Sequence, residues 1–247
     1  MLHCERAQNF VSLNIEHGFF TREGGVSSHP FASLNCSYLV GDEPKNVEIN
    51  RQKILNFLKL SSKQLMVPKI VHGNNVLMLN ENDSAETVAQ TEADALISCS
   101  TSHVLGMTYA DCLAIMVAAE DASVVAIIHA GWRGLLNGVV DDTLRKIYEN
   151  YSRITLRAAI GPALSKSAFH FSGDGFLQFE KRWPQCTAIE NGKTFVDLVE
   201  VAKAQLSAYS IDVEKVGGWT EQDPVRYFSY RRDQKESGRH LAVICKK

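Results

Sequence analysis

The sequence lacks a long hydrophobic run, and no stretch approaches the ~18 apolar residues that a membrane-spanning helix needs. Its first residues, Met1 to Arg6, are polar and contain no signal-peptide core. Basic residues are not in excess either, since 26 Lys and Arg stand against 28 Asp and Glu, for a net charge of −2. This balance argues against a protein built to hold nucleic acid. We therefore expect a cytoplasmic protein, a monomer or weak homo-oligomer, with neither membrane nor nucleic acid among its partners.

Cys-x-x-Cys pairs are also absent, although the chain has six cysteines, and this excludes a zinc ribbon and a thioredoxin-like motif. Without a signal peptide, reduced thiols are the expected state. Most of these cysteines are expected to be small buried hydrophobic residues. Cys112 is the exception, because Asp111 precedes it and two histidines flank apolar runs elsewhere in the chain.

The chain has 247 residues, of which 45% are hydrophobic and 22% charged, so it can bury a sizeable core without disulfides. Apolar residues three and four apart predict helices over residues 44–60, 137–151 and 194–209, the last with Thr194 as its cap. Runs rich in branched and aromatic residues predict strands at 11–13, 76–79, 95–97, 113–118, 124–128, 156–160, 225–230 and 241–244. The polar stretch 80–92 predicts a surface loop, and residues 227–239 predict a hairpin with a basic tip.

Several of the predicted strands are apolar throughout, which is typical of strands covered on both faces. Their order along the chain is mixed and does not alternate regularly with the helices. We therefore predict an α+β fold, a layered sandwich in which helices flank mixed central sheets, formed by a single domain over residues 1–247.

Three potential metal ligands lie at the edges of these apolar runs. His72 follows Ile70 and Val71, Cys112 precedes Leu113, and His129 ends the run 124–128. Two imidazoles and a thiolate suit zinc, with a fourth position left open for water or substrate. The same three residues could instead form a cysteine nucleophile with a histidine base. A lone histidine such as His72 can also be a hydrogen-bonded core residue.

Asp111 and two arginines complete the candidate site. Asp111 could orient a ligand histidine, although capping a turn is the commoner use of such an aspartate. Arg22 precedes Gly24 and Gly25, whose backbone N–H groups could cradle a phosphate with it, or simply form a glycine turn. Arg133 lies in the glycine turn that follows His129, at a strand-to-helix junction where ligands collect in α/β proteins.

Taken in order, these segments resemble the YfiH-like, laccase-domain family. The similarity is carried by HGFFTREGGVSSHPFASLN, VGDEPKNVEINR, VHGNNV, EADALIS, TYADCLAIMV, IHAGWRGLLNGVV, AAIGPALS and YFSYRRDQKESGR, which extend from residue 17 to residue 239. The chain departs from the family pattern at Ile70, Ala163, Phe169, His170 and Trp219. These departures bear on the substrate preference and leave the His-Cys-His set intact.

The resemblance implies a YfiH-like fold in which His72, Cys112 and His129 are zinc ligands at the active site. It implies phosphorolysis of adenosine, inosine and methylthioadenosine to free base and sugar 1-phosphate, together with adenosine deamination. The nucleoside and phosphate would then contact Arg22, Asp111 and Arg133. The expected cofactor is Zn²⁺, with Cu²⁺ as the alternative.

Other functions are compatible with the same residues. The family also carries the label of a copper-dependent polyphenol oxidase, but a multicopper enzyme needs several copper centres and more ligands than eight histidines supply here. A Cys-His hydrolase that edits peptidoglycan precursors is a second alternative, and a non-enzymatic zinc-stabilised domain is a third. A chelator separates them, because a thiol hydrolase should survive it and a zinc-stabilised domain should unfold.

Overall fold

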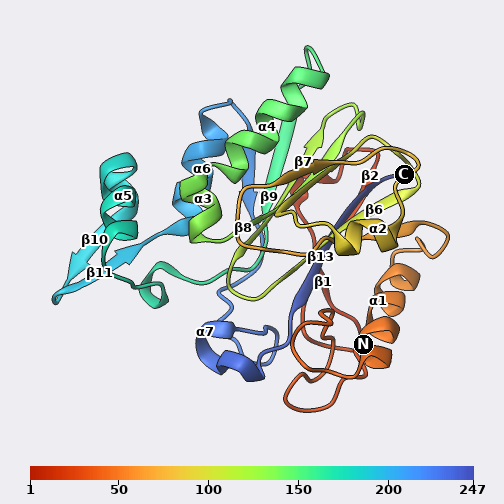
Figure 1. Cartoon of the computed structure of the whole chain (residues 1–247), viewed down its shortest axis with the longest axis horizontal. Helices are drawn as coiled ribbons and strands as arrows, with labels where there is room; N and C mark the ends of the chain where they lie inside the picture. The colour runs from red at the N-terminus through yellow and green to blue at the C-terminus, as the bar shows by residue number, and fades with distance from the viewer.

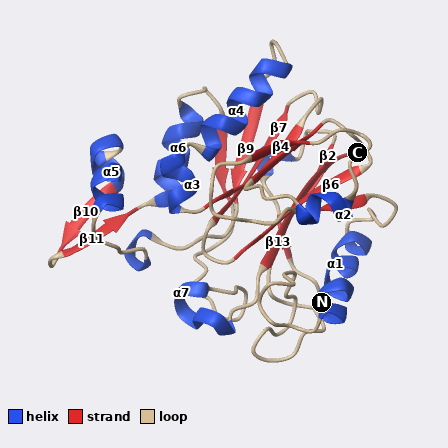
Figure 2. Cartoon of the chain, viewed as in Figure 1, coloured by secondary structure: helices blue, strands red, loops and turns tan.

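Two stacked β-sheets form the centre of the molecule, and helices cover their outer faces (Figures 1 and 2). The computed structural model describes all residues, 1–247. The five-stranded sheet has the order β1-β2-β13-β6-β3, with strands at Cys4–Glu5, Ile15–Phe20, His240–Lys246, His103–Tyr109 and Gln64–Met66. The six-stranded sheet has the order β12-β9-β7-β8-β5-β4, with strands at Asp212–Lys215, Leu156–Ile160, Leu113–Ala119, Val125–Ala130, Ala95–Ser98 and Val76–Met78. Both sheets are mixed, as the sequence predicted.

Helices lie on both sides of the two sheets. Helix α1 (Pro44–Phe57) packs on the outer face of the five-stranded sheet, and α3 (Trp132–Asn137), α4 (Val139–Asn150) and α6 (Leu198–Ser207) pack on the six-stranded sheet. Short helices α2 (Ala85–Gln90) and α7 (Tyr230–Asp233) lie in connections. Helix α5 (Asp174–Arg182) and the hairpin β10 (Thr187–Glu190) and β11 (Lys193–Val196) project from one end (Figure 1). None of these helices has the length and apolar character needed to cross a bilayer.

Strand β7 explains why the sheets stack. Its residues Leu113, Ile115 and Val117 face the helices, whereas Ala114 and Met116 face the other sheet. Because successive side chains of a strand point to opposite faces, a strand buried on both faces must be apolar throughout. The uniformly apolar runs therefore predicted covered strands correctly, and the α+β layered fold is confirmed.

Several local predictions were wrong. Residues 11–13 form a turn, and the neighbouring strand begins at Ile15. Residues 225–229 form a turn and an irregular segment that lead into α7 at Tyr230, so the predicted basic hairpin does not exist. Thr194 belongs to β11, and α6 is capped by Asp197, whose side chain accepts from Glu200 N–H at 3.0 Å. The surface loop over 80–92 is interrupted by α2.

Two buried histidines should make the fold sensitive to acid. The Nε2 atom of His17 accepts from Ala7 N–H at 2.9 Å, and that of His240 accepts from Phe228 N–H at 2.9 Å. Burial lowers the pKa of His17 to about 4 and that of His240 to about 3. At pH values between these folded-state pKa values and the unfolded pKa near 6.5, the unfolded chain binds more protons than the folded chain. The free energy of unfolding therefore falls as the pH falls.

We expect each histidine to remove roughly 2 kcal/mol of the free energy of unfolding between pH 7.5 and pH 5.0. Urea unfolding of the chelator-treated protein at the two pH values measures the loss. His17→Gln keeps an acceptor for Ala7 N–H but cannot titrate, so its loss should be smaller by about that amount. His3→Gln is the control, because His3 is exposed. Equal losses in wild type and His17→Gln would contradict the prediction.

Candidate metal centre

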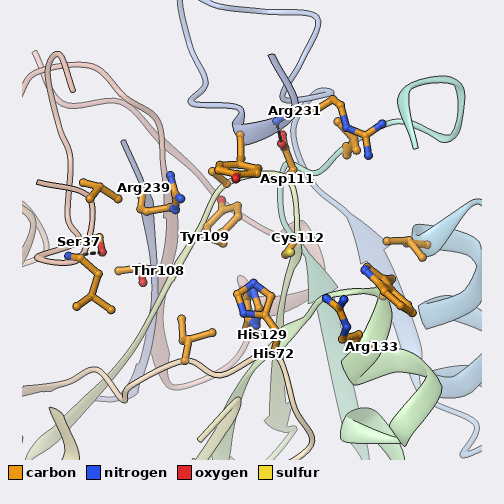
Figure 3. A pocket seen from close by; sticks show the side chains of 18 of the residues that line it. Ser37, His72, Thr108, Tyr109, Asp111, Cys112, His129, Arg133, Arg231 and Arg239 are labelled. Atoms are coloured by element: carbon orange, nitrogen blue, oxygen red, sulfur yellow. Dashed lines mark hydrogen bonds between the residues drawn. The ribbon is translucent and has the colours of Figure 1, made fainter. Parts of the chain in front are cut away.

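His72, Cys112 and His129 come together at one end of the six-stranded sheet (Figure 3). His129 lies in β8, Cys112 in the turn that leads into β7, and His72 in the segment between β3 and β4. Strands β7 and β8 pair with Leu113 opposite Ala130, so Cys112 and His129 meet at the end of the ladder. One ligand atom from each of the three residues lies within 4.8 Å of the others.

The donor set and the space around it fit a metal ion. A Cβ atom added to Gly131 would lie 3.3 Å from Cys112 Sγ, 3.5 Å from His72 Cδ2 and 3.7 Å from His129 Cε1. The glycine therefore leaves room beside all three ligand residues. One thiolate and two imidazoles are ligands that Zn²⁺ prefers, and no fourth His, Cys, Asp or Glu joins the group. Such a three-ligand set leaves a position for substrate.

Asp94 orients two of the three ligand residues, and no pattern in the sequence indicates this role. Its Oδ1 atom lies 2.9 Å from His129 Nδ1 and accepts from His72 N–H at 2.9 Å, and its Oδ2 atom accepts from Gly73 N–H at 2.8 Å. Asp94 is fully buried just before β5. A carboxylate on Nδ1 directs Nε2 of His129 toward the metal position.

Two residues of the centre have an unusual backbone. His72 has φ of 59° and Asp111 has φ of 81°, in the left-handed region that favours glycine. Asp94 holds the His72 backbone, and the Asp111 side chain accepts from the Thr220 hydroxyl at 2.6 Å and from Arg231 N–H at 2.5 Å. These bonds offset the cost of the conformation. The carboxylate beside a ligand histidine is thus Asp94, whereas Asp111 joins the Cys112 turn to α7.

Cys112 and His129 influence each other's protonation. Burial alone would raise the pKa of Cys112, but the charge and hydrogen bonds of His129 and His72 outweigh it and lower that pKa to about 6. Burial would lower the pKa of His129, but the Cys112 thiolate and Asp94 raise it to about 9. The metal-free protein therefore favours a thiolate, which is the form of cysteine that binds metals and acts as a nucleophile.

A cavity of about 560 Å³ opens over the three ligand residues. Apolar residues, among them Trp132, Leu164 and Phe169, form much of its wall, and three arginines also line it. These are Arg133, Arg231 and Arg239. A largely apolar pocket with a few polar groups is the usual form of a small-molecule site.

Only one of the two arginines that the sequence predicted for the substrate site lines the cavity. Arg133 lines the cavity with its guanidinium 4.3 Å above the Trp132 ring. Arg22 does not line the cavity, because its guanidinium donates to Ala32 O at 2.6 and 2.8 Å and to Pro224 O at 3.0 Å. Arg22 therefore joins two loops outside this cavity, and its place in an anion site stays a prediction.

Of the five departures from the family pattern, two reach the cavity. Ile70 and Phe169 are among the lining residues. Ala163 and Trp219 pair with each other in a short β-bridge outside the cavity, and His170 pairs with Phe195 of the projecting hairpin. A change of substrate preference would therefore come from Ile70 and Phe169.

Sequence comparison shows which proteins this chain is similar to. The family model described as "Multi-copper polyphenol oxidoreductase laccase" matches residues 16–247. The purine nucleoside phosphorylase YfiH of Escherichia coli (strain K12) is 34% identical over 232 residues, which cover 91% of this chain and 90% of the relative. The purine nucleoside phosphorylase of Bacteroides thetaiotaomicron is 29% identical over 94% of this chain and 91% of the relative.

Solved structures show the same fold. The crystal structure of YlmD from Geobacillus stearothermophilus matches with a TM-score of 0.89 and 26% identity, and covers 98% of this chain and 94% of that chain. The YfiH protein of Bacillus licheniformis matches with a TM-score of 0.87 and 26% identity, over 94% of this chain and 93% of that chain. By its sequence, its fold and its His-Cys-His centre, the chain belongs to the laccase-like family of YfiH-type proteins.

Proposed function

We propose that the protein is a zinc-dependent purine nucleoside phosphorylase. It would act on adenosine, inosine and methylthioadenosine, with adenosine deamination as a possible second reaction of the same centre. The observation that carries the proposal is the three-ligand His-Cys-His group at the floor of a cavity. The names of the relatives from Escherichia coli and Bacteroides thetaiotaomicron support phosphorolysis.

The cavity suits the two substrates of such a reaction. Trp132, Phe169 and Leu164 offer aromatic and apolar surface to a purine ring. The arginines offer planar cations to phosphate, whose oxygens a guanidinium can bind in pairs. Arg133 lies beside Trp132, so it would contact the nucleoside.

Zinc held by these donors would supply a Lewis acid that stabilises charge on a substrate oxygen or nitrogen. Asp94 would keep His129 in the tautomer whose Nε2 faces the metal position. Asp111 would fix the turn that carries Cys112, through its bonds to Thr220 and Arg231. The apolar wall would exclude water from the breaking bond.

The test is release of free base from inosine and adenosine by the zinc-loaded protein, with and without phosphate. We expect hypoxanthine and adenine to appear only when phosphate is present, and release to stop when a chelator removes the metal. Restoring zinc, but not magnesium, should restore release, because magnesium prefers oxygen ligands. Base release without phosphate would contradict phosphorolysis.

A Cys-His hydrolase is the second candidate, because Cys112, His129 and Asp94 are aligned as a nucleophile, base and orienting carboxylate would be. It would edit peptidoglycan precursors by amide hydrolysis. Its distinguishing property is resistance to chelation. If the chelated protein releases no base but cleaves such amides, the hydrolase replaces the phosphorylase.

A further inference from the structure

The cavity is lined by three arginines but by only one carboxylate, that of Asp111, so positive charge is in excess among its side chains. Arg133, Arg231 and Arg239 form no salt bridge, whereas the ion-paired arginines lie elsewhere, at Arg6, Arg145, Arg157, Arg226 and Arg232. The nearby carboxylate of Asp111 is already bound by Thr220 and Arg231 N–H. A partly buried cation without a partner is costly, so a cavity that keeps one is suited to an anionic ligand.

Arg239 is the best placed of the three arginines to bind such an anion. Its Nη1 atom donates to Ser237 O at 2.6 Å and to Gly238 O at 3.0 Å, which fixes the guanidinium. Its Nη2 and Nε atoms have no protein acceptor and remain available to a ligand. Arg133, in contrast, is exposed, and Arg231, which donates to the carbonyl of Ala168, lies away from Ser37 and Thr108 (Figure 3).

Two hydroxyl groups lie on the same side of the cavity as Arg239. Figure 3 shows Ser37 and Thr108 beside Arg239, with Cys112 and His129 between this group and Arg133. The Ser37 hydroxyl accepts from Leu39 N–H at 3.2 Å, so its own proton is free to donate. The Thr108 hydroxyl has no protein partner.

Asn35 holds this group together. Its Oδ1 atom accepts from Arg239 N–H at 2.9 Å and from Ser37 N–H at 3.2 Å, and its Nδ2 atom donates to Ser37 O at 3.0 Å. Asn35 is fully buried. The loop that carries Ser37 is therefore fixed to the segment that carries Arg239 before any ligand binds, and this limits the ordering that binding requires.

From this geometry we infer that Arg239, Ser37 and Thr108 form the subsite for inorganic phosphate. This deepens the proposed function and rests on it for the reaction. A phosphate oxygen forms the bond to the ribose carbon, and the carbon–nitrogen bond breaks with its electron pair passing to the base. The base takes the proton that the dihydrogen phosphate ion loses, so the products are ribose 1-phosphate and neutral purine.

Calorimetric titration of inorganic phosphate into the zinc-loaded protein tests the subsite without relying on turnover. Arg239→Gln should weaken phosphate binding by about 10- to 100-fold, because a charge-assisted pair is lost. Thr108→Val, which changes one hydroxyl for a methyl group, should weaken it by about 3- to 10-fold. Arg133→Gln should weaken it less than Arg239→Gln does, and Arg153→Gln, which changes an exposed arginine outside the cavity, should leave it unchanged.

Zinc content and thermal melting confirm that each variant is folded. If Arg239→Gln does not fold, Arg239→Lys is decisive, because it keeps the charge and loses the planar fork; it should still bind phosphate more weakly than wild type. Three results would overturn the inference. They are no phosphate binding by the wild type, equally tight binding by the Arg239 variant, and binding that is lost when Arg133, but not Arg239, is replaced. Phosphate that binds through Arg239 without base release would refute the phosphorylase and leave the subsite standing.

Discussion

Cys112→Ala should lose the bound metal and nearly all base release. Cys112 supplies the only thiolate of the centre, and the two histidines that remain make a weak zinc site. Zinc is expected to contribute several kcal/mol to the transition state, so kcat/KM should fall by at least ~10³-fold. Metal analysis after dialysis should find far less than one zinc per chain, against about one in wild type.

The control for this variant is Cys99→Ala. Cys99 is exposed and does not line the cavity, so its loss should change neither zinc content nor kcat/KM. A Cys112→Ala protein that keeps its zinc but loses activity would identify Cys112 as a nucleophile. That outcome would favour the hydrolase and refute the metal role of this residue.

Asp94→Asn should weaken zinc binding although Asp94 touches no metal position directly. The asparagine has one oxygen in place of two, so it cannot accept from Gly73 N–H and also serve His72 N–H and His129 Nδ1. Loss of such an orienting carboxylate typically costs 10- to 100-fold in metal affinity. One buried donor left unpaired should also lower the free energy of unfolding by about 1–3 kcal/mol.

Competition with a chromophoric chelator measures the zinc affinity, and urea unfolding of the metal-free protein measures the stability. Asp42→Asn is the matched control, because Asp42 is also a buried carboxylate and accepts from Ser27 and Asn35 at 2.6 and 2.8 Å. It should lose stability and keep the zinc affinity of wild type. Equal zinc affinities in the two variants would show that Asp94 does not orient the ligands.

The sequence predicted best the elements whose burial is uniform. Strand β7 is apolar along its whole length, and β8 is apolar apart from His129; such short runs with branched residues favour strands. Strand β6 was missed because Gly106 and Thr108 interrupt its apolar pattern. The side chains of Leu65 and Val67 pack closely over Gly106, since each would lie 2.9 Å from a Cβ atom added there. Residues 225–230 show the opposite error, since Tyr227 and Phe228 are buried although their segment pairs with no strand.

Some residues of the candidate site could be predicted from the sequence, and others could not. The three ligand residues could be predicted because each has a rare chemistry and lies at the edge of an apolar run. Asp94 could not, because an aspartate before a strand is usually a turn residue and only the folded chain brings it to His129. Arg239 and Ser37 lie about two hundred residues apart in sequence, and no local pattern indicates that Asn35 joins them.

The position of β13 has a consequence for how the protein is made. This strand lies at the centre of the five-stranded sheet, between β2 and β6, and the ribosome synthesises it after every other strand and helix described here. Until it emerges, β2 and β6 have unpaired edges that invite pairing with other chains. The three ligand residues all precede β13, whereas Arg239 is the residue just before it. The nascent chain could therefore gather its metal ligands early, but a complete pocket would form only with the last strand.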